Sequence, residues 1–255
     1  MDKEKRIMLL KGRTIAVTGA SKGLGLGIVK RLASEGADVV AHYNSGDITE
    51  ARQSVEKAGG KFTAFQADLS KQEEVLGLAE KINGCGDIYG LVNNAGICFF
   101  EDFFDITPES YDMTFNVNMK AVFLLTQKIA KQMVDRKTAG RIVNFSSITA
   151  VSGSATQVHY GAAKGAVSAF THMAAEALGQ YGITVNAVMP GPIPTKHNSA
   201  YLAEEDVKKD LCMRMPMRKY GDPSYIADAI VYFLGEHAGW TTGTLLPVDG
   251  GYLAK

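Results

Sequence analysis

The segment Thr18-Gly-Ala-Ser-Lys-Gly-Leu-Gly25 is the most informative part of the sequence about the fold, because it joins a short β-branched run to an apolar periodic segment. Gly19 permits a tight turn there, and Gly23 and Gly25 allow the backbone to come close to a phosphate and the helix to come close to the sheet. Free N–H groups at the start of the helix can hold a pyrophosphate. Three residues separate the first two glycines, which departs from the common GxGxxG spacing. The placement between a strand and a helix still predicts a phosphate-binding turn.

Strand and helix patterns alternate along the rest of the chain. Short β-branched runs predict strands at Arg13–Thr18, Asp38–His42, Phe62–Gln66, Ile88–Val92, Arg141–Phe145, Ile183–Val188 and Thr244–Val248. Periodic segments predict helices at Leu24–Ser34, Thr49–Ala58, Gln72–Ile82, within Pro108–Val134, and at His159–Tyr181, Ala203–Met213 and Ser224–Gly235. This alternation predicts an α/β fold, a single-domain Rossmann-type doubly wound parallel sheet with helices on both faces.

One domain over residues 1–255 is the economical prediction, because no repeat or Pro/Ser-rich linker interrupts the chain. The longest irregular stretch, Pro190 to Ala200, follows the sixth predicted strand. Strand ends on that side of such a sheet line the ligand crevice, so residues 190–220 are predicted to form a substrate lid of a loop and helices.

The composition indicates which kinds of partner and which cellular compartment to expect. The chain has 255 residues, with 27 Lys plus Arg against 27 Asp plus Glu, so charge gives no argument for nucleic acid or an anionic membrane. The three cysteines show no metal-ligand spacing and are interpreted as reduced thiols. We therefore expect a cytoplasmic protein with a small-molecule substrate, no metal, no nucleic acid and no membrane partner.

A second motif points to proton transfer. Tyr160 and Lys164 are four residues apart on a predicted helix, which places both side chains on one face. A nearby ammonium favours a phenolate and lowers the pKa of a tyrosine, so Tyr160 can take a hydroxyl proton as hydride leaves the adjacent carbon. Ser146 and Ser147 end the fifth predicted strand, at the edge of the sheet where ligands bind. A serine hydroxyl there can bond to the reacting oxygen.

The chain resembles the short-chain dehydrogenase/reductases over essentially its whole length. The matching elements, in order and spacing, are Thr18 to Gly25, Asp68-Leu-Ser70, Asn93-Asn-Ala-Gly96, Asn116-Val-Asn118, Ser146-Ser147, Tyr160 to Lys164, Pro190-Gly191 and Val248-Asp-Gly-Gly251. Each element by itself is weak evidence for the family, but the whole set in this order and spacing is strongly specific for it.

The resemblance implies a catalytic set of four residues. Tyr160 would be the general acid/base, and Lys164 would lower its pKa and hold the nicotinamide ribose. Ser147, thirteen residues before the tyrosine, would polarise the substrate oxygen, with Ser146 as its structural neighbour. Asn118 would anchor a water in a proton relay to Lys164. The predicted substrate contacts are Ser147, Gln157 and Tyr160.

The resemblance also implies the residues around the cofactor, from the adenine to the nicotinamide. They are Gly19, Ser21, Lys22, Gly23, Leu24, Gly25, Tyr43, Asn44, Ser45, Asp68, Leu69, Asn94, Ala95, Gly96, Tyr160, Lys164, Pro190, Gly191, Ile193 and Thr195.

The end of the second strand favours NADP(H) over NAD(H). An NAD-selective enzyme usually has a carboxylate there for the ribose hydroxyl, whereas this chain has Tyr43, Asn44 and Ser45. Lys22 adds a positive charge within the glycine turn. Asn44 stands where the strongest NADP pattern often has an arginine, so NAD(H) remains a possible second cofactor.

Within the family, softer matches resemble bacterial sugar 1-dehydrogenases of the L-rhamnose 1-dehydrogenase type, which oxidise an aldose to a lactone. These matches are Met8–Arg13, Asn93–Cys98, Gln157–Tyr160 and Ala177–Ile183. A carbonyl reductase such as a 3-oxoacyl-thioester reductase is the alternative enzyme, and a non-catalytic nucleotide-sensing protein is a remote one. Fold does not fix substrate, so both alternatives stay open.

Two long apolar segments, Val117 to Met133 and Ala162 to Leu178, are more apolar than one buried stripe requires. Because the family usually pairs these helices between subunits, a homotetramer is expected. The aromatic cluster Phe99, Phe100, Phe103 and Phe104 is interpreted as a buried or subunit-facing patch, and His159 as a packing or interface residue.

Overall fold

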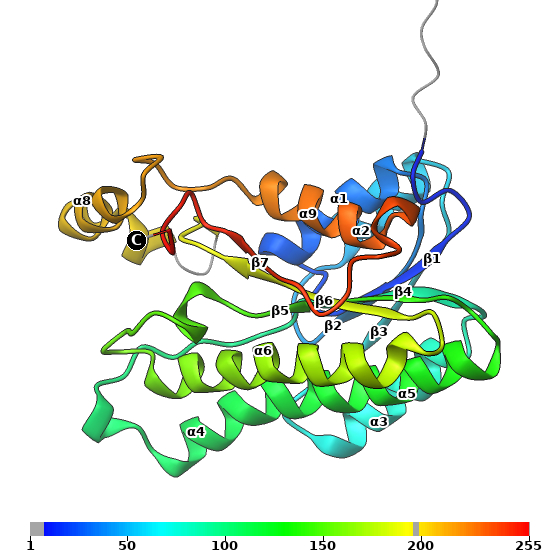
Figure 1. The fold of residues 1–255 in the computed structure, drawn as a ribbon, viewed down its shortest axis with the longest axis horizontal. Helices are drawn as coiled ribbons and strands as arrows, with labels where there is room; N and C mark the ends of the chain where they lie inside the picture. Colours follow the sequence, from blue (N-terminus) through cyan, green and yellow to red (C-terminus); the bar gives the residue numbers. More distant parts are fainter. Residues whose placement is uncertain (1–7, 196–198, 255) are drawn as a thin grey trace, which may run out of the picture.

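The computed structural model describes residues 8–195 and 199–254, and their strands form one parallel sheet. Its seven strands lie in the order β3-β2-β1-β4-β5-β6-β7 (Figure 1). In the centre of the sheet, Ile15 of β1 lies opposite Val39 of β2 and Gly90 of β4. The strands are β1 Thr14–Val17, β2 Asp38–Tyr43, β3 Phe62–Gln66, β4 Ile88–Asn93, β5 Arg141–Phe145, β6 Thr184–Pro190 and β7 Leu245–Val248.

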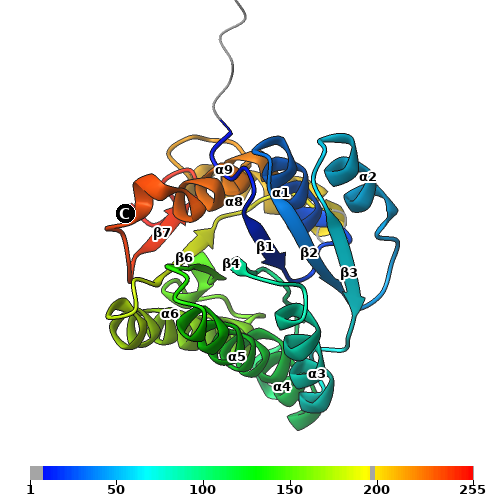
Figure 2. The ribbon, with the colours of Figure 1, turned by 90° about the vertical axis from the view of Figure 1, so that its right-hand side faces the viewer.

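Helices cover both faces of this sheet, which confirms the predicted fold class. Figures 1 and 2 show α1, α2 and α9 on one face and α3, α4, α5 and α6 on the other. The helices are α1 Gly23–Ser34, α2 Thr49–Lys57, α3 Gln72–Asn83, α4 Pro108–Phe115, α5 Ala121–Asp135, α6 Val158–Gly179, α7 Ser199–Ala203, α8 Glu205–Arg214 and α9 Pro223–Leu234. Short 3₁₀ turns occur at Phe103–Asp105, Ile148–Ala150 and Glu236–Ala238.

Two apolar layers hold the sheet between the helices. On one side, residues of α1 and α9 such as Ile28, Leu32 and Ile230 pack on the sheet, and on the other side Leu125 and Ile129 of α5 do the same. All six residues of β4 are buried, as expected for a central parallel strand that is covered on both faces.

The long helix expected within Pro108–Val134 is interrupted by a wider turn. Between α4 and α5, residues Asn116–Lys120 form one π-helical turn, in which the N–H of Ala121 reaches back to the carbonyl of Asn116. Such turns widen a helix by one residue and often occur at functional sites. This turn carries Asn118, which is buried.

The ligand crevice is expected at the carboxyl ends of the central strands. β1 is followed by α1 on one face and β4 by α4 on the other, so the chain reverses its winding between these two neighbours (Figure 2). Figure 1 shows α8 and the C-terminal end of the chain together at one end of the molecule. The predicted lid thus contains α7 and α8, and its residues 196–198 lie outside the described residues.

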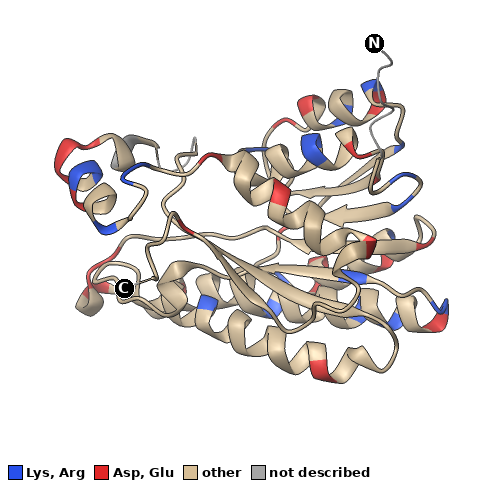
Figure 3. Cartoon of the chain, turned by 45° about the horizontal axis from the view of Figure 1, so that its top comes forward, with Lys and Arg blue, Asp and Glu red and all other residues tan. Residues whose placement is uncertain are grey.

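Charge is mixed over the surface elements rather than gathered in one area (Figure 3). No helix in the described part of the chain combines the length and apolar character needed to cross a bilayer. Within the same residues, His, Cys, Asp and Glu side chains form no group of three that could hold a metal ion.

Candidate active site

The glycine-rich turn has the geometry that a phosphate group requires. Gly19 has φ +69° and Gly23 has φ +56°, in the left-handed region that favours glycine. A Cβ on Gly25 would lie 2.0 Å from the carbonyl oxygen of Gly19, so only glycine lets the turn close on the helix. The side chain of Lys22, the residue before α1, makes no capping hydrogen bond, and the N–H groups at the start of a helix are suited to bind an anion. The turn therefore fits the pyrophosphate of a dinucleotide.

The segment after β4 is hydrogen-bonded to this turn. Asn94 Nδ2 donates to the carbonyl oxygens of Thr18 and Gly19, at 2.8 and 3.2 Å. The N–H of Ala95 donates to Thr18 Oγ1 at 3.0 Å. A Cβ on Gly96 would come within 2.7 Å of Asn118 Oδ1. The predicted cofactor residues 94–96 are thus packed tightly between the glycine turn and the π-helical turn.

The ends of β2 and β3 lie beside the glycine turn. Ser21 Oγ donates to the carbonyl of Ser45 at 3.3 Å, and Gln66 Nε2 donates to the carbonyl of Asn44 at 2.8 Å. Asp68 accepts hydrogen bonds from the N–H and hydroxyl of Ser70, which hold the pKa of its carboxyl below the usual range. The structure brings the predicted adenine-side residues to one edge, with no carboxylate at positions 43–45.

Asn118 fixes the loop after β4. Its Oδ1 accepts from the N–H of Ile97 at 3.0 Å, and its Nδ2 donates to the carbonyl of Ile97 at 2.8 Å. The Asn118 amide therefore holds the loop that carries Gly96. Gly96 lies beside the ammonium of Lys164, because a Cβ on Gly96 would be 3.5 Å from Lys164 Nζ. A role of Asn118 in proton relay stays a prediction.

The two serines after β5 have different surroundings. Ser146 Oγ lies 3.1 Å from the carbonyl of Lys164 and 2.7 Å from Ser168 Oγ, so it ties β5 to α6. Ser147 Oγ accepts from the N–H and the hydroxyl of Thr149, at 3.1 and 2.8 Å, and hydrogen-bonds with Tyr160. Of the two serines, Ser147 is thus the one that interacts with Tyr160, and its contact with the substrate oxygen stays a prediction.

Burial dominates the electrostatics of the Tyr160–Lys164 pair. Lys164 Nζ lies 5.7 Å from the centre of the Tyr160 ring and donates to the carbonyl of Phe145 at 2.8 Å. Burial lowers the pKa of Lys164 to about 8. Burial also raises the pKa of Tyr160, and nearby Cys98 adds to that rise, whereas the hydrogen bond from Ser147 opposes it. The expected lowering of the pKa of Tyr160 by Lys164 does not occur in this structure, where desolvation of the phenolate is the largest effect and raises that pKa.

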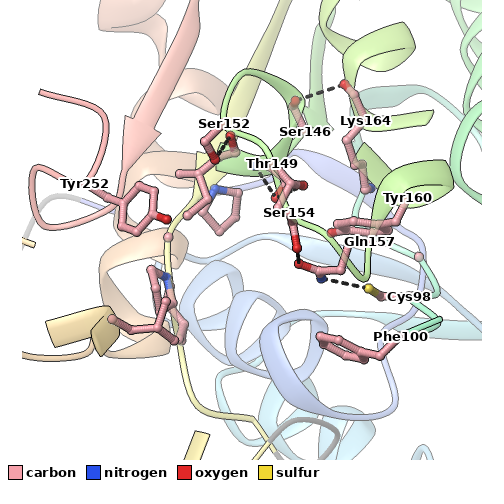
Figure 4. Close-up of a pocket in the computed structure, with 18 of the residues that line it drawn as sticks. Cys98, Phe100, Ser146, Thr149, Ser152, Ser154, Gln157, Tyr160, Lys164 and Tyr252 are labelled. Atoms are coloured by element: carbon pink, nitrogen blue, oxygen red, sulfur yellow. Dashed lines mark hydrogen bonds between the residues drawn. The ribbon is translucent and has the colours of Figure 1, made fainter. Parts of the chain in front are cut away.

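A cavity of about 670 Å³ opens in front of Ser147, Tyr160 and Lys164. Gln157 is held within its wall: its Oε1 accepts from Ser154 Oγ at 2.9 Å, and its Nε2 lies 3.0 Å from Cys98 Sγ (Figure 4). The predicted site residues that line this cavity are Leu24, Asn94, Gly96, Ser147, Gln157, Tyr160, Lys164, Pro190, Gly191, Ile193 and Thr195. The remaining predicted cofactor residues lie outside its lining: Ala95 follows β4, and the others lie along the glycine turn and just after or at the ends of β2 and β3.

The far wall of the cavity comes from residues that the sequence did not single out. Leu202 of α7, Arg214 of α8 and Tyr252 near the C-terminus line it. Arg214 Nη1 donates to Tyr252 Oη at 3.2 Å, and Arg214 Nε lies 3.0 Å from Asp210 Oδ2. No motif marks these residues, because they meet only when the lid segment folds over the sheet edge.

Two other interpretations can be compared with the structure. His159 is buried, stacks on Phe99 and lies 3.3 Å from Glu101 Oε2, and it is absent from the cavity lining, in agreement with a packing role. The aromatic cluster is not buried as a whole: Phe103 and Phe104 are 60% and 95% exposed in the chain, and Phe100 lines the cavity. The segment bends outward there in a short 3₁₀ turn.

Comparison with known proteins identifies the family of this chain. A family model described as enoyl-(acyl carrier protein) reductase matches residues 19–253. The chain is 37% identical to an L-rhamnose 1-dehydrogenase (NADP(+)) of Thermoplasma acidophilum, over 95% of this chain and 97% of that protein. It is 35% identical to a 2-dehydro-3-deoxy-D-gluconate 5-dehydrogenase of Bacillus subtilis, over 96% of each.

A solved structure gives the same result for the fold. An Agrobacterium tumefaciens protein with bound NADP superposes with a TM-score of 0.92 at 33% identity, over 98% of this chain and all of that one. The chain belongs to the short-chain dehydrogenase/reductase family of oxidoreductases.

Proposed function

We propose that this protein is an NADP(H)-preferring sugar 1-dehydrogenase that oxidises an aldose at its anomeric carbon to a lactone. The observation that carries the proposal is the chemistry of the cavity wall around Tyr160. It includes the hydroxyl and amide groups of Thr149, Ser152, Ser154 and Gln157, with the phenol of Tyr252 opposite (Figure 4). Such groups donate and accept hydrogen bonds without charge, which suits a neutral polyhydroxy substrate. The activity of the Thermoplasma acidophilum relative supports the same substrate class.

Tyr160 is the proton acceptor in the proposed reaction. The substrate hydroxyl lies at Ser147 and Tyr160, whose hydroxyls already share a hydrogen bond. The bound oxidised nicotinamide supplies the hydride acceptor. Once Tyr160 has lost its own proton, its phenolate takes the proton of the C1 hydroxyl as the C1–H bond breaks, so that the C1 carbonyl of the lactone forms. Ser147 holds the reacting oxygen in place and donates to it.

Lys164 has a positional and an electrostatic role in this proposal. Its ammonium is fixed by the Phe145 carbonyl at 2.8 Å, on the side of Tyr160 that faces Gly96. From there it can hold a ribose hydroxyl and offer a path for the proton that leaves Tyr160. Its pKa of about 8 allows it to exchange a proton near neutrality.

A sugar acid is the second candidate substrate, because the Bacillus subtilis relative acts on one and Arg214 lines the cavity. The guanidinium of Arg214 already pairs with Asp210 and donates to Tyr252. Because these partners occupy its charge and donors, the cavity favours a neutral sugar over a sugar acid. The test is a panel of aldoses and sugar acids with NADP⁺, with acetoacetyl thioesters and NADPH as the contrast. An aldose with the highest kcat/KM supports the proposal, and reduction of the thioester as the best reaction refutes it.

Lys22→Ala is expected to reduce the preference for NADP⁺. Lys22 is an exposed residue of the glycine turn, just before α1. Positions 43–45 have no carboxylate that would repel a 2′-phosphate. Removing one exposed charge–phosphate contact costs roughly 1 kcal/mol, so kcat/KM for NADP⁺ should fall about fivefold to tenfold while that for NAD⁺ changes little. Lys30→Ala, on the same helix but paired with Glu50, is the matched control. A wild-type preference for NAD⁺ of about tenfold or more, which is 1.4 kcal/mol, would contradict the cofactor assignment.

We also propose a cytoplasmic homotetramer. Large apolar side chains are exposed on the outer helices, including Tyr111 and Met113 of α4, Phe123 of α5 and Met173 of α6. An area of this kind is typical of a subunit interface. Light scattering should give four times the mass of the chain, and a monomer at micromolar concentration would refute the assembly. The three cysteines are free, in keeping with a reducing compartment.

A further inference from the structure

His42 is a buried polar residue in a strand that is otherwise apolar at its centre. The sequence of β2 is Asp-Val-Val-Ala-His-Tyr, and the imidazole is 2% exposed. It is neither part of the cavity lining nor one of the residues that the family motifs mark. A buried imidazole needs hydrogen-bond partners, and the identity of those partners shows what this residue does.

The two ring nitrogens bond to two different loops of the cofactor site. The N–H of Gly19, in the glycine turn, donates to Nδ1 at 3.2 Å. Nε2 lies 3.0 Å from the carbonyl oxygen of Ala67, just before Asp68 and Leu69. A carbonyl can only accept, so Nε2 carries the proton and Nδ1 is the acceptor. Both bonds are therefore made only by the neutral ring in this one tautomer.

The backbone of the same strand end adds two further bonds to these loops. The N–H of Ala20 donates to the carbonyl of His42 at 2.9 Å, and the N–H of Ala67 donates to the carbonyl of Tyr43 at 3.1 Å. The glycine turn and the turn after β3 are thus both fixed to the end of β2. His42 is the one side chain among the described residues for which bonds to both turns are recorded.

We infer that His42 is a positioning residue that sets the phosphate turn relative to the adenine-side turn, and that its protonation weakens cofactor binding. A protonated ring has an N–H at Nδ1, which would face the N–H of Gly19 and break that bond. The inference rests on the proposal that the glycine turn holds the cofactor. It adds a pH dependence of affinity that no motif of the sequence indicates.

The surroundings of His42 set the direction of this pH dependence. The flanking strands β1 and β3 carry no titratable side chain. The two turns carry the charged residues Lys22 and Asp68, and Asp68 contacts Lys71 and Glu74 at the start of α3. Burial lowers the pKa of His42, and the bond to Ala67 opposes this shift. The neutral, binding-competent ring therefore persists at neutral pH, and affinity should fall only below the ordinary imidazole pKa of about 6.5.

The test measures the Kd of NAD⁺ and NADP⁺ by titration calorimetry from about pH 8 down to the acid limit of folding. NAD⁺ is the decisive probe, because the 2′-phosphate of NADP⁺ titrates itself near pH 6. Three variants are compared with the wild type. His42→Asn keeps an acceptor near the position of Nδ1 without a titratable ring, and His42→Phe removes both bonds. His159→Asn changes an equally buried histidine that does not touch the cofactor turns.

The wild type and His159→Asn should lose NAD⁺ affinity by up to about tenfold per pH unit below the pKa of His42. His42→Asn should bind within about threefold of the wild type at pH 8 and show no acid loss. His42→Phe should bind about tenfold or more weakly at every pH. Thermal melts of each variant separate weakened binding from unfolding.

Either of two results would overturn the inference: the same acid loss in His42→Asn as in the wild type, or wild-type affinity at pH 8 in a folded His42→Phe. A flat wild-type profile for NAD⁺ down to unfolding would also overturn it. If the wild type bound neither nucleotide at any pH, the proposed function itself would fail, which is a distinguishable outcome.

Discussion

Replacement of Tyr160 by phenylalanine is expected to lower kcat/KM by about 10³-fold to 10⁴-fold, because general acid–base catalysis of this kind contributes up to that factor. The change removes only the hydroxyl that hydrogen-bonds with Ser147. The ring and its packing against the Lys164 ammonium remain, so the Kd of NADP⁺ should change less than threefold, roughly 0.6 kcal/mol. Steady-state kinetics and a nucleotide titration on the same preparation measure both effects.

Tyr252→Phe is the matched control for this change. Tyr252 lines the same cavity and its hydroxyl accepts from Arg214, but it lies on the far wall from Ser147 and Lys164. Its loss should raise KM by no more than about tenfold and leave kcat nearly unchanged, the effect of one lost hydrogen bond. A Tyr160→Phe enzyme with most of the wild-type kcat would refute the role of Tyr160.

The pH profile provides a second readout for Tyr160. Burial raises the pKa of Tyr160, so the phenol keeps its proton at neutral pH in the protein as described. Oxidation of the sugar needs the deprotonated form, and reduction needs the protonated one. The kcat/KM for oxidation should therefore rise with pH through the neutral range, while that for the reverse reduction should not.

Gly25→Ala is expected to abolish cofactor binding within the measurable range, a loss of affinity of about 100-fold or more. The new Cβ would lie 2.0 Å from the Gly19 carbonyl oxygen and 2.6 Å from Asn94 Nδ2, and the first of these atoms belongs to the backbone of the turn itself. The turn must open to relieve this overlap, and its N–H groups then no longer converge on a pyrophosphate. Nucleotide titration and a thermal melt of the variant measure the result.

Gly27→Ala controls for the helix in which Gly25 lies. A Cβ on Gly27 would meet only Pro223 Cβ, at an ordinary 3.8 Å, so this substitution should keep wild-type affinity. It should also stabilise the protein slightly, by up to about 1 kcal/mol, because alanine is the better residue in a helix interior. Wild-type binding by Gly25→Ala would show that the turn does not hold the cofactor as proposed.

The fold class and the motif residues of the candidate site could be predicted from the sequence. The periodicity of strands and helices is a local property, because it depends only on residues that are close in the sequence. The need for glycine at Gly19 and Gly23 is also local, because it follows from the positive φ of each residue. The spacing of Tyr160 and Lys164 likewise places both on one helix face without reference to the rest of the chain. The exact interruption between α4 and α5 was not visible, because the π-helical turn at Asn116–Lys120 has no strong local signal.

The electrostatics and the distant contacts of these residues could not be predicted from the sequence, because they depend on the folded chain. The direction of the pKa shift of Tyr160 depends on how much solvent the surrounding chain excludes, which is not a property of the motif. Arg214 and Tyr252 became cavity residues because the lid and the C-terminal segment meet at the sheet edge. His42 gained two partners from loops 23 and 25 residues away along the chain. Contacts between residues far apart in sequence, and the desolvation they cause, exist only once the chain has folded.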